Sequence, residues 1–447
     1  MNGCAARGCH GGPTIGPDGQ SRAVNSGNAF THWLLHDRHA RAYHALTTEK
    51  SSEIIRRLGK GWRAATEEPR CLACHTTPAL ATPPPASDEV RRLRFEGVSC
   101  DACHTRPRHG TGEWLTRHTK GWADGGLPDC YQNRGMRWFG DATARAATCV
   151  GCHVGAPARS GLPARDVTHD LIAAGHPRLN FEYLTYLSAL PPHWIEHGPR
   201  PAPAPPSQAP VSPGYEAHAW LAGQIETARA GLELCAARAK NWPELAEFDC
   251  YSCHHDLKPA GRASWRALRA AARSPGAPGR LPWAGANVSD PLLKFLTPVF
   301  ADRFAAAGRD ATSWHPPDVK EFAELLPRPG AVPTLDAADP QAGLKLFQEL
   351  RLRERAAAGE LWRMSWDEAA QTYYALRAAD ASRRRAGPPD APDEGIAASL
   401  ERVRKVVVLP QHPRVNSPAT YDPNATAKAI GEVIAAFEQW SAKHTQR

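Results

Sequence analysis

The chain of 447 residues has only three methionines, Met1, Met136 and Met364, and no long apolar run. No stretch approaches the roughly 18 apolar residues of a membrane span, so we expect no transmembrane segment. Basic residues are dispersed among acidic ones, apart from Arg383, Arg384 and Arg385, so the formal charge of +8 does not indicate nucleic-acid binding. Cysteine is absent after residue 260, which confines cysteine chemistry to the preceding part of the chain.

Before residue 260 most of the cysteines lie in a repeated motif. Four segments read C-x-x-C-H, at Cys71, Cys74 and His75; Cys100, Cys103 and His104; Cys149, Cys152 and His153; and Cys250, Cys253 and His254. With 12 Cys and 20 His, chance predicts about 0.01 copies. The pattern indicates covalent haem c, in which two thiols bond the porphyrin and the adjacent imidazole is the proximal iron ligand. Zinc knuckles or redox C-x-x-C pairs are the alternatives, but zinc does not need a His after each second Cys.

The first ten residues contain a variant of this motif. Cys4 and Cys9 are separated by four residues instead of two, and His10 follows. The longer loop still lets both sulfurs reach the ring edge, whereas the alternative is a terminus with free or disulfide-bonded thiols. We therefore expect five haem c groups, with His10 as the fifth proximal ligand.

The scarcity of methionine makes bis-His ligation the expected arrangement, since Met136 is the one methionine considered as an iron ligand. If 31–46 is helical, His32, His36 and His39 share one face, and His169 and His176 lie two turns apart in the same way. His255 follows a proximal His and points away from its own haem. The distal candidates are His39, His118, His169, His176 and His255.

Haem attachment takes place outside the cytoplasm, so we expect a periplasmic or extracellular protein. No basic segment followed by an apolar one precedes Cys4, so the expected export leader is absent from the given chain. Five haems would add about ten propionate charges, which brings the holoprotein near neutrality. The expected partners are redox proteins and not nucleic acid.

The composition divides the chain into four parts. Residues 1–197 form a multihaem core with four haem sites, and 198–214 form a Pro-rich linker. Residues 215–260 carry a helix and the fifth haem site, and 261–447 form a helical extension without haem. The expected fold is mainly α with extensive irregular coil, wrapped around closely stacked haems.

Three helices are predicted in the later parts. Leu221, Ile225, Ala228 and Leu232 form the apolar stripe of an amphipathic helix from Glu216 to about Lys240. Cys235 falls on the same stripe, which favours a small buried side chain over a redox thiol. Residues 365–368 form a capping box for a helix through Ala379. A closing helix contains Ile430, Val433, Ile434 and Phe437.

Several motifs together resemble a known family. W-x5-HARAY (33–43), EGVSCDACH (96–104), CVGCHVG (149–155) and HDLIAAGHPRL (169–179) are similar to the multihaem cytochromes related to the tetrahaem cytochrome c of nitrifying bacteria. The resemblance covers about residues 1–260. It implies haems stacked at near contact, His39 as a distal ligand, and electron transfer from a partner such as hydroxylamine oxidoreductase. The opening motif and the CHHDL site depart from the tetrahaem pattern.

Two classes of function remain. The first is an electron-transfer protein whose closely packed, mostly bis-His haems carry electrons between partners. The second is an oxidoreductase acting on a small nitrogen or sulfur compound, such as nitrite, hydroxylamine or sulfite, at a five-coordinate haem. The C-x-x-C-K motif of nitrite reductases is absent, and no catalytic residues are identified, so the sequence favours the carrier.

Overall fold

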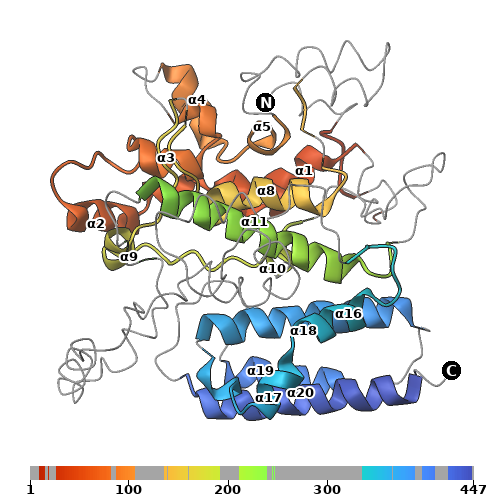
Figure 1. Ribbon diagram of the computed structural model, residues 1–447. Coiled ribbons are helices and arrows are strands. Elements are labelled where there is room, and N and C mark those ends of the chain that lie inside the picture. The colour runs from red at the N-terminus through yellow and green to blue at the C-terminus, as the bar shows by residue number, and fades with distance from the viewer. Residues whose placement is uncertain are drawn as a thin grey trace, which may run out of the picture. The chain divides into compact units, whose positions relative to one another are not determined.

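The architecture is known from a computed structural model (Figure 1). It describes residues 10–15, 19, 27–81, 87–105, 135–137, 139–159, 161–191, 211–238, 244, 246, 335–364, 366–387, 395–407 and 421–444. Among these residues there are helices, isolated β-bridges and much coil, but no strand. The predicted fold class, mainly α with extensive coil, is confirmed. No described helix is both long and apolar enough to span a membrane.

The chain forms two compact units. Unit 1 comprises Met1–His176 and Thr185–Val211, and unit 2 comprises Pro177–Leu184 and Ser212–Arg447. All three described C-x-x-C-H motifs therefore belong to unit 1. The long helix that precedes the last C-x-x-C-H motif belongs to unit 2, together with the C-terminal helices.

Unit 1 is built from short helices. The α-helices are α1 (Ala29–His36), α2 (Glu49–Leu58), α3 (Pro69–His75), α4 (Asp88–Phe95), α5 (Cys100–His104), α8 (Ala142–His153) and α9 (His169–Ala173). Helix α10 (Tyr183–Ala189) crosses the boundary between the units, and η1 (Arg38–Arg41), η2 (Tyr43–Thr47) and η3 (Pro78–Leu80) are 3₁₀ turns.

Local capping explains where several of these helices begin. The Thr48 side chain accepts from Ser51 N at the start of α2, Ser87 accepts from Val90 N at α4, and Asp141 accepts from Ala144 N at α8. Helix α2 then ends at Gly59, whose φ of 76° lies in the left-handed region that glycine adopts easily. Such caps let helices of two or three turns form without long propagation.

Two predicted helical arrangements in unit 1 are wrong. Helix α1 ends at His36 because Asp37 adopts an extended conformation. The Asp37 carboxylate accepts from His39 N, so His39 belongs to a separate 3₁₀ turn that begins at Arg38. Helix α9 ends at Ala173, and Gly175 has a φ of 116°. His39 does not continue the face of His32 and His36, and His176 does not share a helix with His169.

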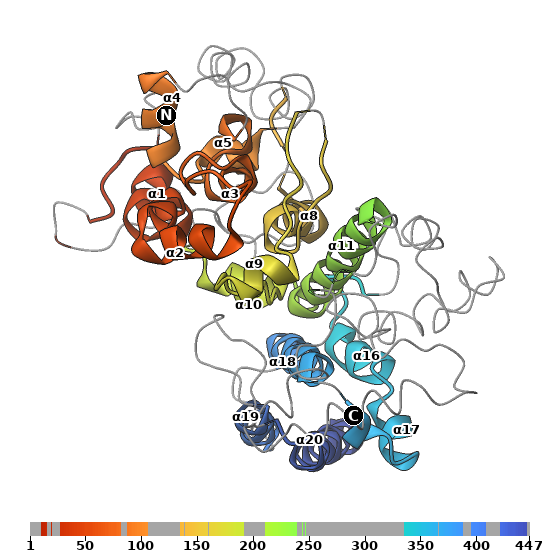
Figure 2. The same ribbon diagram turned by 90° about the vertical axis from the view of Figure 1, so that its left-hand side faces the viewer.

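Unit 2 is a helical assembly around one apolar core. Its main helices are α11 (Tyr215–Arg238), α16 (Ala342–Glu349), α17 (Leu352–Ala357), α18 (Trp366–Ala386), α19 (Ile396–Val406) and α20 (Pro423–His444), with the 3₁₀ turn η7 (Leu361–Arg363). Within this unit α18, α19 and α20 lie side by side in Figure 1 and Figure 2. The three predicted helices are thereby confirmed, although α18 extends beyond Ala379.

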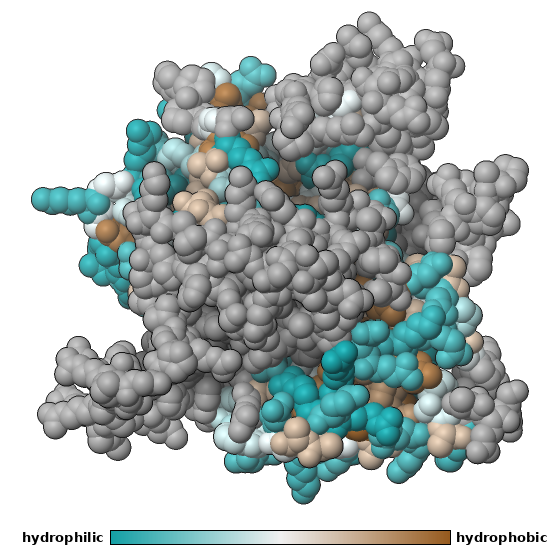
Figure 3. Space-filling model, viewed as in Figure 1, coloured by the Kyte–Doolittle hydropathy of each residue, from teal (hydrophilic) through white to brown (hydrophobic). Residues whose placement is uncertain are grey.

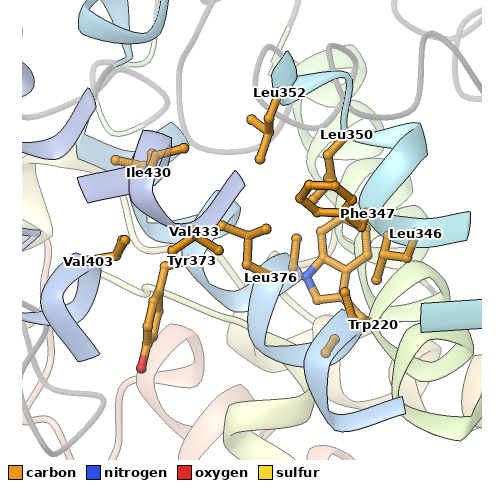
Figure 4. Close-up of a cluster of buried hydrophobic side chains, with 14 of the residues drawn as sticks. Trp220, Leu346, Phe347, Leu350, Leu352, Tyr373, Leu376, Val403, Ile430 and Val433 are labelled. Carbon is orange, nitrogen blue, oxygen red and sulfur yellow. The ribbon is translucent and has the colours of Figure 1, made fainter. Parts of the chain in front are cut away.

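The core of unit 2 joins residues far apart in sequence (Figure 4). Phe347 of α16 stacks on Phe437 of α20 with ring centroids 4.4 Å apart, and Trp220 of α11 is 1% exposed. Trp366 Nε1 donates to Val407 O at 2.8 Å, which ties α18 to the end of α19. In the space-filling view, the visible surface of the C-terminal helices is mostly hydrophilic, with small apolar areas (Figure 3).

Helix α11 is buried on more than its predicted apolar stripe. Leu221, Ile225 and Leu232 are 1–2% exposed as expected, but Gln224 and Glu226 are 3% exposed as well. Gln224 Nε2 donates to Gln371 Oε1 of α18 at 2.9 Å, which partly satisfies a buried amide. The amphipathic interpretation is therefore incomplete, because polar side chains of this helix are also enclosed.

Candidate haem-binding site

Each described C-x-x-C-H motif occupies a helix whose last residue is the motif's histidine. Helix α3 ends at His75, α5 at His104 and α8 at His153. In a helix, residues at i, i+3 and i+4 lie on one face, so both thiols and the imidazole are presented together. The helices themselves lie near one another in Figure 1 and Figure 2. The motif spacing thus has a direct structural reason.

The α3 motif is positioned by a buried carboxylate. Glu68, 3% exposed, accepts from Arg70 N and Arg63 N and from Arg70 Nε at 2.5 Å. These hydrogen bonds lower the Glu68 pKa despite its burial. The Arg70 guanidinium in turn lies over the Trp62 ring, 3.4 Å from its centroid. The start of the helix that carries Cys71 and Cys74 is therefore held firmly.

The EGVS segment before α5 packs against the HARAY segment. Val98 N donates to His39 O at 2.9 Å, and Trp33 Nε1 donates to Val98 O at 3.2 Å. Gly97 has a φ of 65°, and an added Cβ would collide with His39 O. The two sequence motifs of the family resemblance therefore meet here, and Gly97 is the residue that permits the close approach.

The sulfurs of two motifs lie within hydrogen-bonding reach. The Cys74 thiol is hydrogen-bonded to Cys152 Sγ, which raises the Cys74 pKa and lowers the Cys152 pKa; the Arg165 guanidinium also lowers the latter. Burial raises the pKa of Cys71 and Cys103 to about 11. No two of the six described motif cysteines are joined by a disulfide. Helices α3 and α8 thus direct sulfur towards a shared interior.

Two pairs of imidazoles face each other in the same interior. The ring centroids of His75 and His176 are 6.4 Å apart with planes at 88°, and those of His39 and His153 are 5.9 Å apart at 74°. An imidazole nitrogen binds a first-row metal at about 2 Å, so two rings sharing one iron have centroids roughly 6 Å apart. The spacing of both pairs fits axial ligation of a haem iron.

Hydrogen bonds orient two of these rings for ligation through Nε2. His75 Nδ1 lies 2.8 Å from Ala42 O, and His39 Nδ1 lies 2.9 Å from Asp37 Oδ1. Metal-binding histidines usually donate their second ring nitrogen in this way, because the bond fixes the tautomer and increases ligand basicity. The donor set therefore fits haem c, which the motifs imply.

The electrostatics of the rings differ. Burial lowers the pKa of His153 to about 4, with smaller contributions from His39 and His75, and burial also lowers the pKa of His75. At His39 burial acts in the same direction, but the hydrogen bond and negative charge of Asp37 outweigh it and raise the pKa. His75 and His153 are thus neutral at neutral pH, as iron ligation requires.

Three further described candidates have different surroundings. The His104 ring contacts Phe139 edge to face at 5.1 Å. His169 is half-buried and is the first residue of α9. His10 is exposed, and its carbonyl accepts from Phe30 N at the start of α1. None of these contacts assigns an iron to the residue.

The other predicted site residues lie outside the described residues. These are Cys4, Cys9, His118, Cys250, Cys253, His254 and His255. Cys130 also lies outside them, as does the side chain of Cys235 on α11. Their roles remain predictions.

Sequence reasoning missed Asp37, Gly97 and Arg165. The HDRH spacing of Asp37 is a detectable signal, since an acidic residue two positions before a ligand can accept from its backbone and ring. Gly97 follows a helix end, where glycine is common and has no special meaning. Arg165 is twelve residues from His153 in the sequence, and only the tertiary fold places it beside the α8 motif.

Comparison with known proteins is consistent with this site. Residues 26–105 match the family described as cytochrome c554 and c-prime. No curated protein and no solved structure matches the chain. The matched segment includes His39 and the α3 and α5 motifs, whose contacts are described above. The match supports a multihaem c-type cytochrome family, with haem c as cofactor and electron transfer as the general role.

Proposed function

We propose that this chain is a periplasmic or extracellular electron-transfer protein with five covalent haems, most of them ligated by two histidines. The observation that carries the proposal is the pair of imidazole contacts, His75 with His176 and His39 with His153. Two imidazoles on one iron leave no position for a substrate, which favours a carrier over an enzyme.

The chain's own residues hold and orient the group. Haem c supplies a one-electron Fe(III)/Fe(II) couple when bound. Ala42 O and Asp37 hold the Nδ1 atoms of His75 and His39, so their Nε2 atoms are available to iron. Tyr186 lies against His153 with ring centroids 4.9 Å apart, which restricts rotation of that imidazole. A rigid ligand set changes little between oxidation states, which suits rapid electron transfer.

The physiological partners are proposed to be redox proteins. Likeness to the tetrahaem cytochrome of nitrifying bacteria favours a donor of the hydroxylamine oxidoreductase class. The competing proposal is an oxidoreductase that acts on nitrite, hydroxylamine or sulfite at a five-coordinate haem. Turnover assays with an artificial electron donor or acceptor separate the two, because a carrier shows no appreciable turnover of these compounds.

The haem count is tested by intact mass. Protein matured with the haem-attachment machinery should carry five haems, including one at Cys4 and Cys9. A mass with four haems, together with alkylation of Cys4 and Cys9 by iodoacetamide, would disprove the fifth site.

A further inference from the structure

Arg165 returns to the α8 motif from twelve residues further along the chain. Its Nη1 lies 4.0 Å from Cys152 Sγ. A Cβ on Gly151, between the two cysteines of the motif, would lie 3.4 Å from Arg165 Nη2. The guanidinium therefore lies directly on the helix that bears Cys149, Cys152 and His153.

The intervening loop is built to hold this position. Ala156 and Arg165 exchange two backbone hydrogen bonds of 2.9 Å, and Arg159 and Leu162 exchange another two, of 3.1 and 2.8 Å. Gly155 and Gly161 provide the positive φ angles, 136° and 81°, that the turns require. The chain thus folds back in a short ladder, and the position of Arg165 is fixed by its backbone.

Among the described residues, Arg165 has no carboxylate partner, in contrast to Arg56, Arg70 and Arg383, which pair with Glu53, Glu68 and Asp380. Its guanidinium lies instead near a sulfur atom, Cys152 Sγ. The sulfurs bond the vinyl-derived edge of a c-type haem, and the propionates lie at the opposite edge. A propionate of a haem held by Cys149 and Cys152 would therefore not neutralise Arg165.

We propose that Arg165 sets the reduction potential of the haem attached through Cys149 and Cys152, by placing a positive charge beside its thioether edge. The inference rests on the proposed function, since it requires a haem at this motif. One electron from a donor protein converts Fe(III) to Fe(II), so the charge of the site falls by one. A nearby cation favours the reduced state, and burial weakens the screening of this interaction. Arg165 is a positioning charge and not an iron ligand.

The test is a spectroelectrochemical titration of the holoprotein and of Arg165→Gln, Arg165→Lys and Arg159→Gln. Arg159 is exposed in the same loop and is the matched control. In Arg165→Gln, the equilibrium constant for reduction of one haem should fall about tenfold, a decrease of about 59 mV for one electron. The other haems should titrate as before, and Arg165→Lys should retain most of the wild-type potential.

Two results would overturn the inference: titration curves of Arg165→Gln and wild type that superimpose, or an equal shift in Arg159→Gln. Loss of a haem from Arg165→Gln in intact mass would also overturn it, because Arg165 would then act in attachment or folding. Absence of haem from the Cys149–Cys152 peptide of the wild type is a different result, and it would contradict the proposed function itself.

Discussion

Asp37 acts on His39 through two hydrogen bonds. Its carboxylate, 3% exposed, accepts from the backbone N and from Nδ1 of His39. An imidazole that donates to a carboxylate is a more basic ligand, and loss of such a partner typically weakens metal affinity about 10–100-fold. Asp37, which directly follows α1, is thus expected to strengthen iron binding by His39, a proposed ligand.

We expect Asp37→Asn to weaken ligation by His39. Part of one low-spin haem should become high-spin in the electron paramagnetic resonance spectrum of the oxidised protein, since the amide is a poorer acceptor. Asp170→Asn, at an exposed position in α9, should leave the spectrum unchanged. Equal spectra for Asp37→Asn and wild type would mean that the carboxylate does not support an iron ligand.

His176 is the partner of His75 in the wider imidazole pair. Replacement by alanine should convert one low-spin haem to a high-spin haem that binds carbon monoxide when reduced, because an axial position opens. The control is His44→Ala: His44 is exposed, and its Nδ1 is 3.3 Å from Thr47 Oγ1. If His176→Ala neither gains a high-spin signal nor binds carbon monoxide, the proposed pairing with His75 is wrong.

At the scale of elements, the spacing of apolar residues predicted helices of unit 2 correctly, whereas the spacing of histidines predicted the helices of unit 1 poorly. Helices α11, α18 and α20 contribute apolar residues to one core, so the 3.6-residue period is visible in the sequence. In unit 1 the described apolar cluster is small and centres on Tyr43, Leu46 and Leu72. The backbone turns at Asp37 and Gly175 end the helices there, so the spacing of histidines expected for a continuous helix does not predict which rings share a face.

The sequence predicted the proposed haem-attachment residues of the candidate site but not the residues that position them. The spacing of C-x-x-C-H contains all the local information that a helix needs to present sulfur and imidazole on one face. The contacts of Gly97 with His39 O and of Arg165 with Cys152 join distant segments. Such contacts depend on tertiary packing, which a single sequence does not reveal.

Replacing two glycines of unit 2 by alanine should change the stability of the protein in opposite directions. A Cβ at Gly343 would collide with Ala379 O and lie 2.8 Å from Arg383 N, so Gly343→Ala should force α16 away from α18 and destabilise the protein by about 1–3 kcal/mol. A Cβ added at Gly431 in α20 would meet no atom of another part of the protein within 4 Å. Gly431→Ala should therefore stabilise the protein by about 0.5–1 kcal/mol.

Thermal unfolding of the two variants measures the difference. Helix propensity favours alanine in both, so a stabilised Gly343→Ala would show that the helices do not approach as closely as described. The haem absorption spectrum provides a second readout, since the three described C-x-x-C-H motifs lie in unit 1 and neither glycine does.

At the scale of the whole molecule, the two units have different kinds of interior. Unit 2 encloses an apolar core of its own, with Leu376, Val433 and Ile430 fully buried. We propose that residues 261–447 are a structural extension, since they contain no cysteine and the core to which their described helices contribute consists of hydrocarbon and aromatic groups. The described part of unit 1 instead gathers thiols and imidazoles, and porphyrins would supply much of its apolar interior.

The central claim is that two imidazoles occupy the axial positions of most of the irons, as the two described pairs suggest for theirs. Low-temperature electron paramagnetic resonance of the fully oxidised holoprotein tests it directly, because bis-His ferric haem is low-spin and a haem with an open position is high-spin. We predict low-spin signals for all haems except at most one. High-spin signals from two or more haems would contradict the account and would favour a haem enzyme with open iron positions.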